Sequence, residues 1–169
     1  MAFREIKAEE LQGNLFEMIG KQWMLVTAGD ERKCNTMTAS WGGTGIMWGK
    51  PTATAYIRQT RYTKEFIDNS EYFTLSFLGE EYREALKLCG SVSGRDCDKM
   101  KETGLTPCYI EGTTAIQEAE VILVCKKVYH QFMGPENFDE KANLDKWYSD
   151  KDYHTMYLGE IVKVLVREV

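Results

Sequence analysis

The fold prediction starts from the polar run Cys34-Asn35-Thr36-Met37-Thr38-Ala39-Ser40-Trp41 and from the segment Thr52 to Arg58, which follows it across a glycine-rich stretch. Residues 36–41 are rich in strand-forming side chains, and residues 52–58 alternate between apolar and polar ones, so both predict strands. The intervening Gly42-Gly43-Thr44-Gly45 predicts a flexible loop, which Gly49-Lys50-Pro51 closes.

Outward from this pair, short apolar runs alternate with turn signals. We expect further strands at residues 23–28, 72–78, 115–132 and 157–166, the third of which holds one strand or two. We expect helices at residues 8–19, 63–70 and 80–88, another that starts at Ser93-Gly94-Arg95-Asp96, and a polar loop with a helical turn at residues 134–152. No helix lies regularly between strands, so the pattern predicts a mainly β barrel with peripheral helices and not a doubly wound parallel sheet.

Length and composition describe one globular unit. The 169 residues are 43% hydrophobic and 28% charged, which fits a single domain over residues 1–169 and excludes a disordered chain. The net charge of −5 argues against nonspecific binding to nucleic acid or to an anionic membrane. No apolar run approaches the ~18 residues that span a bilayer, and the charged N-terminal stretch is not a signal peptide, so we expect a cytoplasmic protein.

The cysteines and histidines do not form a metal-binding pattern. The five cysteines include no Cys-x-x-Cys pair, and neither of the two histidines completes a zinc knuckle, so we predict no metal site. Reduced thiols are the simplest interpretation of the cysteines. The sequence also lacks the glycine-rich phosphate loops of common nucleotide-binding folds.

Cations and hydroxyl groups cluster where a strand is expected to end and a helix to begin, in Tyr56-Ile57-Arg58-Gln59-Thr60-Arg61-Tyr62-Thr63-Lys64. A helix N-terminus carries unpaired N–H groups and a partial positive charge. Arg58 or Arg61 could hold a phosphate bidentately while Thr60 and Thr63 donate hydroxyl hydrogen bonds. A capped helix with a solvated basic turn explains the same residues, so both interpretations stay open.

The run at residues 34–41 suits a flat heterocyclic ligand. Its small side chains allow close approach, and its backbone and hydroxyl groups can bond the polar edge of such a ring. An ordinary strand beside a mobile glycine loop is the other interpretation.

Taken in order, these two stretches resemble proteins of the flavin reductase-like domain family, and most of all its flavoredoxin-like subgroup. Further matches are Cys89-Gly90, the segment from Ser93 to Met100, Gly104-Leu105-Thr106-Pro107, His154, and Leu158-Gly159-Glu160-Ile161. The resemblance extends from about Leu15 to Val166. It implies a six-stranded antiparallel Greek-key split β-barrel that forms a homodimer, with FMN near the subunit interface.

The resemblance also implies the cofactor-binding residues. Backbone groups of Met37, Thr38, Ala39 and Ser40 would line the isoalloxazine ring and ribityl chain, in a strand segment that also includes Asn35, Thr36 and Trp41. Arg58 and Thr63 would bind the FMN phosphate, together with Thr60 and Arg61. Cys89, Gly90 and Ser91 would flank the flavin, and His154 would lie near its open face as the catalytic candidate.

The implied activity is that of an oxidoreductase. NAD(P)H would deliver hydride to the flavin, and electrons would pass to free flavin or to a partner protein. The alternatives are a flavoredoxin-type electron carrier with little NAD(P)H turnover, a non-catalytic FMN-binding module, or a barrel adapted to pyridoxamine phosphate, haem or a deazaflavin.

Other side chains have two interpretations each. Judged from the residues alone, His154 is a structural histidine, as is His130. Four aromatic side chains either shield the flavin face or fill the dimer interface: Trp41, Trp48, Trp147 and Tyr148. Among them Trp48 is the lid candidate, with a core role as its alternative. We expect an ion cluster at a helix start from Arg95, Asp96, Asp98 and Lys99.

Overall fold

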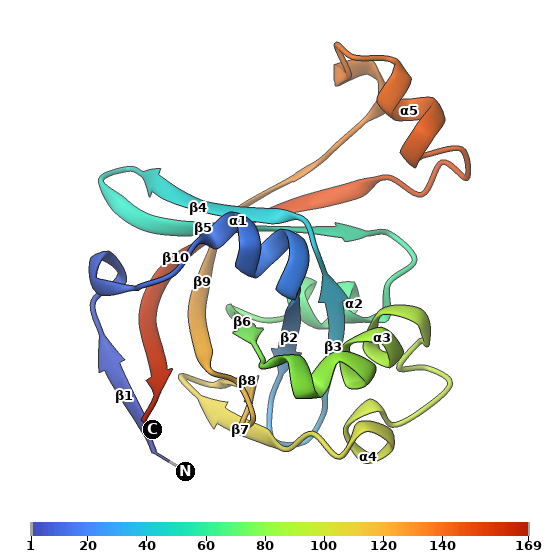
Figure 1. Cartoon of the computed structure of the whole chain (residues 1–169). Coiled ribbons are helices and arrows are strands. Elements are labelled where there is room, and N and C mark those ends of the chain that lie inside the picture. Colours follow the sequence, from blue (N-terminus) through green and yellow to red (C-terminus); the bar gives the residue numbers. More distant parts are fainter. Residues whose placement is uncertain (1, 169) are drawn as a thin grey trace.

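The computed structural model describes residues 2–168, and its centre is an eight-stranded antiparallel sheet (Figure 1). The strand order is β3-β2-β6-β9-β10-β5-β4, and β1 pairs with β10. The strands are β1 (Phe3–Ile6), β2 (Met24–Gly29), β3 (Cys34–Ala39), β4 (Gly42–Met47), β5 (Lys50–Arg58), β6 (Tyr72–Phe77), β9 (Val121–Phe132) and β10 (His154–Arg167). A separate hairpin joins β7 (Pro107–Ile110) to β8 (Thr113–Ile116).

The sheet confirms a mainly β antiparallel fold, but it has eight strands where six were expected. Its edges, β3 and β4, follow one another in the chain, and within residues 2–168 no ladder joins them, so the barrel is split. The additional strands have two sources. One is β1, which pairs with the far half of β10, and the other is the glycine-rich segment, which pairs with β5.

The predicted glycine loop is wrong, because residues 42–47 form a regular strand. Gly42 pairs with Ala55 and Met47 with Lys50, around a tight turn in which both Trp48 and Gly49 have positive φ. A Cβ on Gly42 would lie 2.8 Å from the Thr54 carbonyl oxygen, so glycine here permits close packing of the two strands. Trp48 lies exposed at the tip of this hairpin, far from its Gly42 end, which contradicts both a core role and a lid role over its own chain's strand ends.

The helices are short and lie at the periphery. They are η1 (Ala8–Glu10), α1 (Leu15–Glu17), the π-helical η2 (Met18–Gln22), α2 (Tyr62–Asp68), η3 (Glu80–Tyr82), α3 (Arg83–Ser91), α4 (Lys99–Thr103), η4 (Pro135–Asn137) and α5 (Ala142–Trp147). None of the helices described is both long and apolar enough to cross a lipid bilayer.

Two predicted helices have different bounds from those expected. The helix expected over residues 8–19 is interrupted at Gly13, whose φ of 125° is a backbone conformation that amino acids with a side chain rarely adopt. It restarts after Asn14, whose side chain caps α1 by accepting hydrogen bonds from Phe16 N and Glu17 N. The helix expected to start at Ser93 begins at Lys99, because the Asp98 carboxylate caps the Lys101 N–H.

The core lies on both faces of the sheet. Along β2, Met24 and Val26 pack into one cluster and Leu25 into the other, as the two-residue period of a strand requires. The first cluster fills the barrel interior and includes Phe73, while α3 and the β7–β8 hairpin cover the second. Burial on both faces explains why the central strands read as continuous apolar runs.

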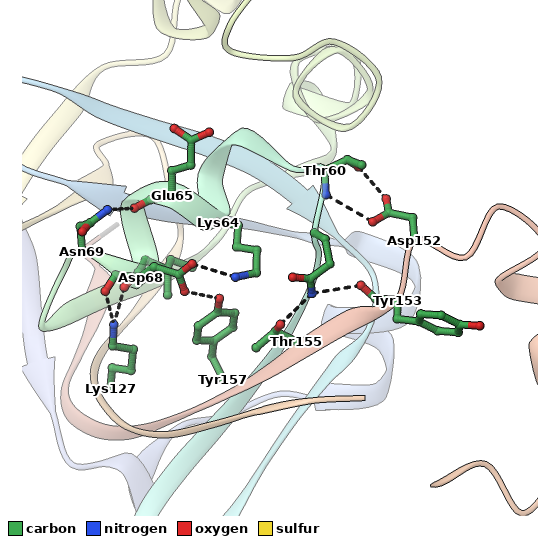
Figure 2. A network of polar contacts seen from close by, with 12 residues as sticks. Thr60, Lys64, Glu65, Asp68, Asn69, Lys127, Asp152, Tyr153, Thr155 and Tyr157 are labelled. Atoms are coloured by element: carbon green, nitrogen blue, oxygen red, sulfur yellow. Dashed lines mark hydrogen bonds and ion pairs between the residues drawn. The ribbon is translucent and has the colours of Figure 1, made fainter. Parts of the chain in front are cut away.

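A polar network anchors α2 to the barrel (Figure 2). The Tyr157 hydroxyl donates to Asp68 at 2.5 Å, and Lys64 donates to the same carboxylate. The Lys127 ammonium donates to the carbonyl oxygens of Ile67 and Asp68. Burial, followed by the neighbouring Asp68 carboxylate, raises the pKa of Tyr157, so its hydroxyl stays protonated and donates. The network therefore fixes the helix that follows the basic turn.

The ends of β9 and β10 extend beyond the barrel and carry the segment 133–153, which includes α5 (Figure 1). Thr155 of β10 pairs with Phe132, the last residue of β9, where the two strands meet this segment. The segment returns to the barrel through contacts with the C-terminal end of β5, where Arg58 pairs with His154. It therefore borders the region where the predicted site residues lie.

Candidate functional site

A cavity of about 360 Å³ lies between the end of β3, the end of β5 and the end of α3. Its lining consists of Met37, Thr38, Ala39, Ser40, Trp41, Tyr56, Arg58, Arg61, Gly90, Trp147 and His154. All but Tyr56 belong to the residues named from the sequence as candidates at or beside a flavin. The structure thus brings together two stretches that lie about twenty positions apart in the sequence.

The wall formed by β3 presents its backbone to the cavity. This strand is an edge of the sheet, and β2 is its only strand partner among residues 2–168, so one row of its N–H and C=O groups has no ladder. The Thr38 hydroxyl donates to the Leu86 carbonyl at 2.5 Å and fixes α3 against the strand. A Cβ on Gly90 would lie 3.4 Å from the Thr38 Cβ, an ordinary van der Waals contact, so the end of α3 packs directly against β3 here.

Two cations, the half-buried Arg61 and the buried Lys99, hold the end of α3. The Arg61 guanidinium donates to the carbonyl oxygens of Gly90 at 2.8 Å and Cys89 at 3.3 Å. The Lys99 ammonium donates to the carbonyl oxygens of Cys89 at 2.8 Å and Thr36 at 2.9 Å, and the residue is only 5% exposed. The ion cluster expected around Lys99 is therefore wrong, since this side chain joins β3 to α3.

Neither cation has a carboxylate partner in the part of the chain that the structure describes. Burial lowers the pKa of Arg61 and lowers that of Lys99 to about 8, because the charged forms lose hydration. Positive charge that is wholly or partly withdrawn from water without a counter-ion is costly, and an anionic ligand in the adjoining cavity would offset that cost.

His154 lies on the opposite wall, where aromatic rings surround it. Its Nδ1 is 2.7 Å from the Tyr148 hydroxyl, and its ring centroid is 5.0 Å from that of Trp41, which in turn contacts Trp147 edge to face. Burial, and after it the Arg58 charge, lowers the pKa of His154 to about 4. The imidazole is therefore neutral at pH 7 and suited to hydrogen bonding and stacking.

The lowered pKa predicts a pH-dependent stability. A histidine with a depressed folded-state pKa stabilises the fold above its unfolded pKa of 6.5, and this contribution is lost as the pH falls to about 4. We expect urea unfolding to show a loss of up to about 3 kcal/mol from this group between pH 7.5 and pH 4, and His154→Gln should remove that part of the slope. The exposed His130, replaced by Gln, is the matched control and should leave the slope unchanged. Equal slopes in wild type and His154→Gln would contradict a buried neutral imidazole.

Several residues expected to touch a flavin lie behind the walls instead. Thr63 is fully buried and its hydroxyl accepts from the Asn35 amide at 2.8 Å, so the phosphate contact expected of its side chain would require this bond to be given up. The Thr36 hydroxyl pairs with Thr27 at 2.8 Å. These side chains fix β3 to α2 and β2.

The remaining expected residues also bond within the protein. Cys89 is fully buried, and burial raises the pKa of its thiol to about 11, so only its backbone carbonyl serves the site. The Ser91 hydroxyl donates to the Lys87 carbonyl within α3. Thr60 bonds the carboxylate of Asp152.

Two residues at the site were missed or misjudged from the sequence. Tyr56 lies two positions before Arg58 on the same strand face, so the two-residue period of β5 was a usable signal. Lys99 carries no such signal, because its position depends on how α4 packs in three dimensions.

Comparison with known proteins gives a consistent result. The sequence model described as the flavin reductase like domain matches residues 17–169. No curated protein matches the chain significantly.

Solved structures share the fold. The flavoredoxin from Methanosarcina acetivorans is 22% identical, with 87% of this chain and 69% of that chain covered and a TM-score of 0.68. The flavoredoxin of Desulfovibrio vulgaris (Miyazaki F) is 25% identical, with 86% of this chain and 69% of that chain covered and a TM-score of 0.68. An FMN-binding protein from Thermus thermophilus is 19% identical, with 98% of this chain and 82% of that chain covered and a TM-score of 0.69. Because the family's sequence model covers nearly the whole chain, the chain belongs to the flavin reductase like domain family.

Proposed function

We propose that this protein binds FMN in the 360 Å³ cavity, with the flavin ring along the backbone of residues 37–40 and the phosphate held by Arg58 and Arg61. The observation that carries the proposal is the meeting of an unladdered strand edge with two guanidinium groups around one cavity. A volume above about 300 Å³ is usual for small-molecule sites. Hydrogen bonds from a strand edge suit the polar edge of the ring, and paired guanidinium N–H groups suit a phosphate.

The chemistry of the residues present fits this cofactor. Arg61 and Lys99 place positive charge without a carboxylate partner, among the residues described, beside and behind the cavity of a protein whose net charge is −5. The aromatic wall of Trp41, Trp147 and His154 offers flat apolar surfaces against which rings pack.

We further propose that the protein is an oxidoreductase in which NAD(P)H supplies hydride and a free flavin or a protein partner receives the electrons. Bound FMN supplies the hydride-accepting and electron-donating chemistry. The chain's own residues position the ligands: β3 supports the ring, the cations stabilise negative charge near it, and the aromatic wall limits access of water. Since His154 is neutral, it serves in orientation and not as a general acid at pH 7.

A flavoredoxin-type electron carrier is the second candidate. The similarity to two structures named flavoredoxin, at 22% and 25% identity, favours it.

We also propose that the protein is a cytoplasmic homodimer. Exposed apolar side chains on the β9 extension, Tyr129 at 44% and Phe132 at 50%, are suited to contact with a second subunit.

Anaerobic absorption spectroscopy tests the proposed function. Purified protein is expected to take up FMN with a shift of its absorption bands, and NADH or NADPH should then bleach the flavin band at least tenfold faster than it bleaches free FMN. Bleaching by a reduced ferredoxin but not by either nicotinamide would favour the carrier. A protein that leaves the FMN spectrum unchanged would contradict the binding proposal itself.

A further inference from the structure

An acidic residue already lies on part of the proposed phosphate site. The Asp152 carboxylate accepts hydrogen bonds from the Thr60 N–H at 3.3 Å and from the Thr60 hydroxyl at 2.5 Å (Figure 2). A hydroxyl and a backbone N–H at the end of a strand are groups that also bond phosphate oxygens. A carboxylate of this chain is therefore bound where an anionic ligand would find its donors.

The same segment also holds Arg58. One terminal nitrogen of its guanidinium donates to the Asp152 carbonyl at 2.8 Å and to the Asp150 carboxylate at 3.3 Å. The other donates to the Trp147 carbonyl at 2.7 Å. The segment 147–152 thus engages both Arg58 and Thr60, while Arg61 bonds only α3 carbonyls in the hydrogen bonds described.

We propose that Asp150 and Asp152 determine how strongly this site prefers a phosphorylated flavin over an unphosphorylated one, because they compete with the phosphate for Arg58 and Thr60. This inference rests on the proposed function. It adds a role for the acidic segment, which neither the cavity lining nor the family resemblance assigns.

The competition follows from charge and from donor number. Arg58 has five N–H donors in a fixed planar arrangement, and three hydrogen bonds already go to residues 147–152. A phosphate that binds the fork bidentately must displace or share these bonds. It must also approach two carboxylates, whose negative charge opposes that of the phosphate at short range. Riboflavin ends in an uncharged ribityl hydroxyl, so its binding requires neither the displacement of the Arg58 hydrogen bonds nor the approach of a negative charge to these carboxylates.

A consequence concerns Trp147, which lines the cavity. Its carbonyl is bound by Arg58 and its ring contacts Trp41. When the phosphate takes over Arg58, the tether on Trp147 weakens. The acidic segment thereby links occupation of the phosphate site to the freedom of one aromatic wall.

The test compares dissociation constants of FMN and riboflavin for the double variant Asp150→Asn/Asp152→Asn. Asparagine keeps the size and a carbonyl acceptor but removes the negative charge. We expect FMN to bind about threefold to tenfold more tightly than to the wild type, and riboflavin to change less than about twofold. Asp145→Asn is the matched control, since Asp145 is exposed in the same segment and no described contact joins it to Arg58; it should leave both constants unchanged.

The single variant Asp150→Asn is a second test that does not depend on the fold of the double variant, because the Asp150 side chain is 64% exposed and its replacement should not disturb folding. It should lower the dissociation constant of FMN by about twofold. Weaker FMN binding, an unchanged FMN constant, or equal changes for FMN and riboflavin would overturn the inference. If the wild type prefers FMN but the double variant keeps the same preference, only the inference fails. If the wild type binds neither ligand, the proposed function fails as well.

Discussion

Arg58→Ala is expected to weaken FMN binding about 10-fold to 100-fold while changing riboflavin binding by less than about threefold. Arg58 lines the cavity and is the proposed phosphate ligand at the end of β5. A bidentate guanidinium–phosphate contact adds a charge-assisted pair of hydrogen bonds that riboflavin cannot form, so the ratio of the two dissociation constants isolates the phosphate term. Fluorescence titration of the apoprotein measures both constants under identical conditions.

Two controls separate this effect from a loss of structure. Arg58→Lys keeps the charge but loses the fork, and it should fall between wild type and Arg58→Ala. Arg4→Ala removes an exposed arginine from β1, which pairs with the far half of β10, and it should change neither constant. Because Arg58 also holds the segment 147–152, a loosened wall would weaken riboflavin as much as FMN. Equal weakening would therefore contradict the phosphate role.

The strands could be predicted from the sequence because the two signals used, the alternation of side chains and the turn residues at each end, are local. Residues 36–41, 52–58 and 72–78 alternate or run apolar between turn residues, and each became a strand within a few positions. The glycines at residues 42–45 were misleading. They signal a loop by composition, but in a paired strand they allow the backbone of β5 to come close, and only the neighbouring strand reveals this.

The site could be predicted only in part for the same physical reason. The β3 segment and the basic turn follow from the sequence, yet their meeting depends on the register in which β10 pairs with β5. Thr63 and Thr60 have the right chemistry for a phosphate, but one is buried against Asn35 and the other is bound by Asp152. Which hydroxyl stays available is decided by tertiary partners, and these leave no periodic trace in the chain.

Gly159→Ala is expected to lower the free energy of unfolding by about 3 kcal/mol. A Cβ at this position would lie 2.6 Å from the Cys125 Cβ and 2.9 Å from the Phe73 Cζ, and both neighbours are fully buried. These side chains have little room to move in a packed core, so the added methyl group forces strain on the sheet. Urea denaturation at a fixed protein concentration measures the change.

Gly45→Ala is the matched control, because a Cβ there meets nothing within 4 Å, and it should change stability by less than about 0.5 kcal/mol. An equally mild effect at Gly159 would mean that the barrel interior yields more readily than its packing indicates. The position also matters for the site. The register of β10 against β9 shifts between Leu158 and Gly159, and the half of β10 before this shift pairs His154 with Arg58. Strain at Gly159 should therefore weaken riboflavin and FMN alike, since it displaces the wall of the cavity and leaves the phosphate donors chemically intact.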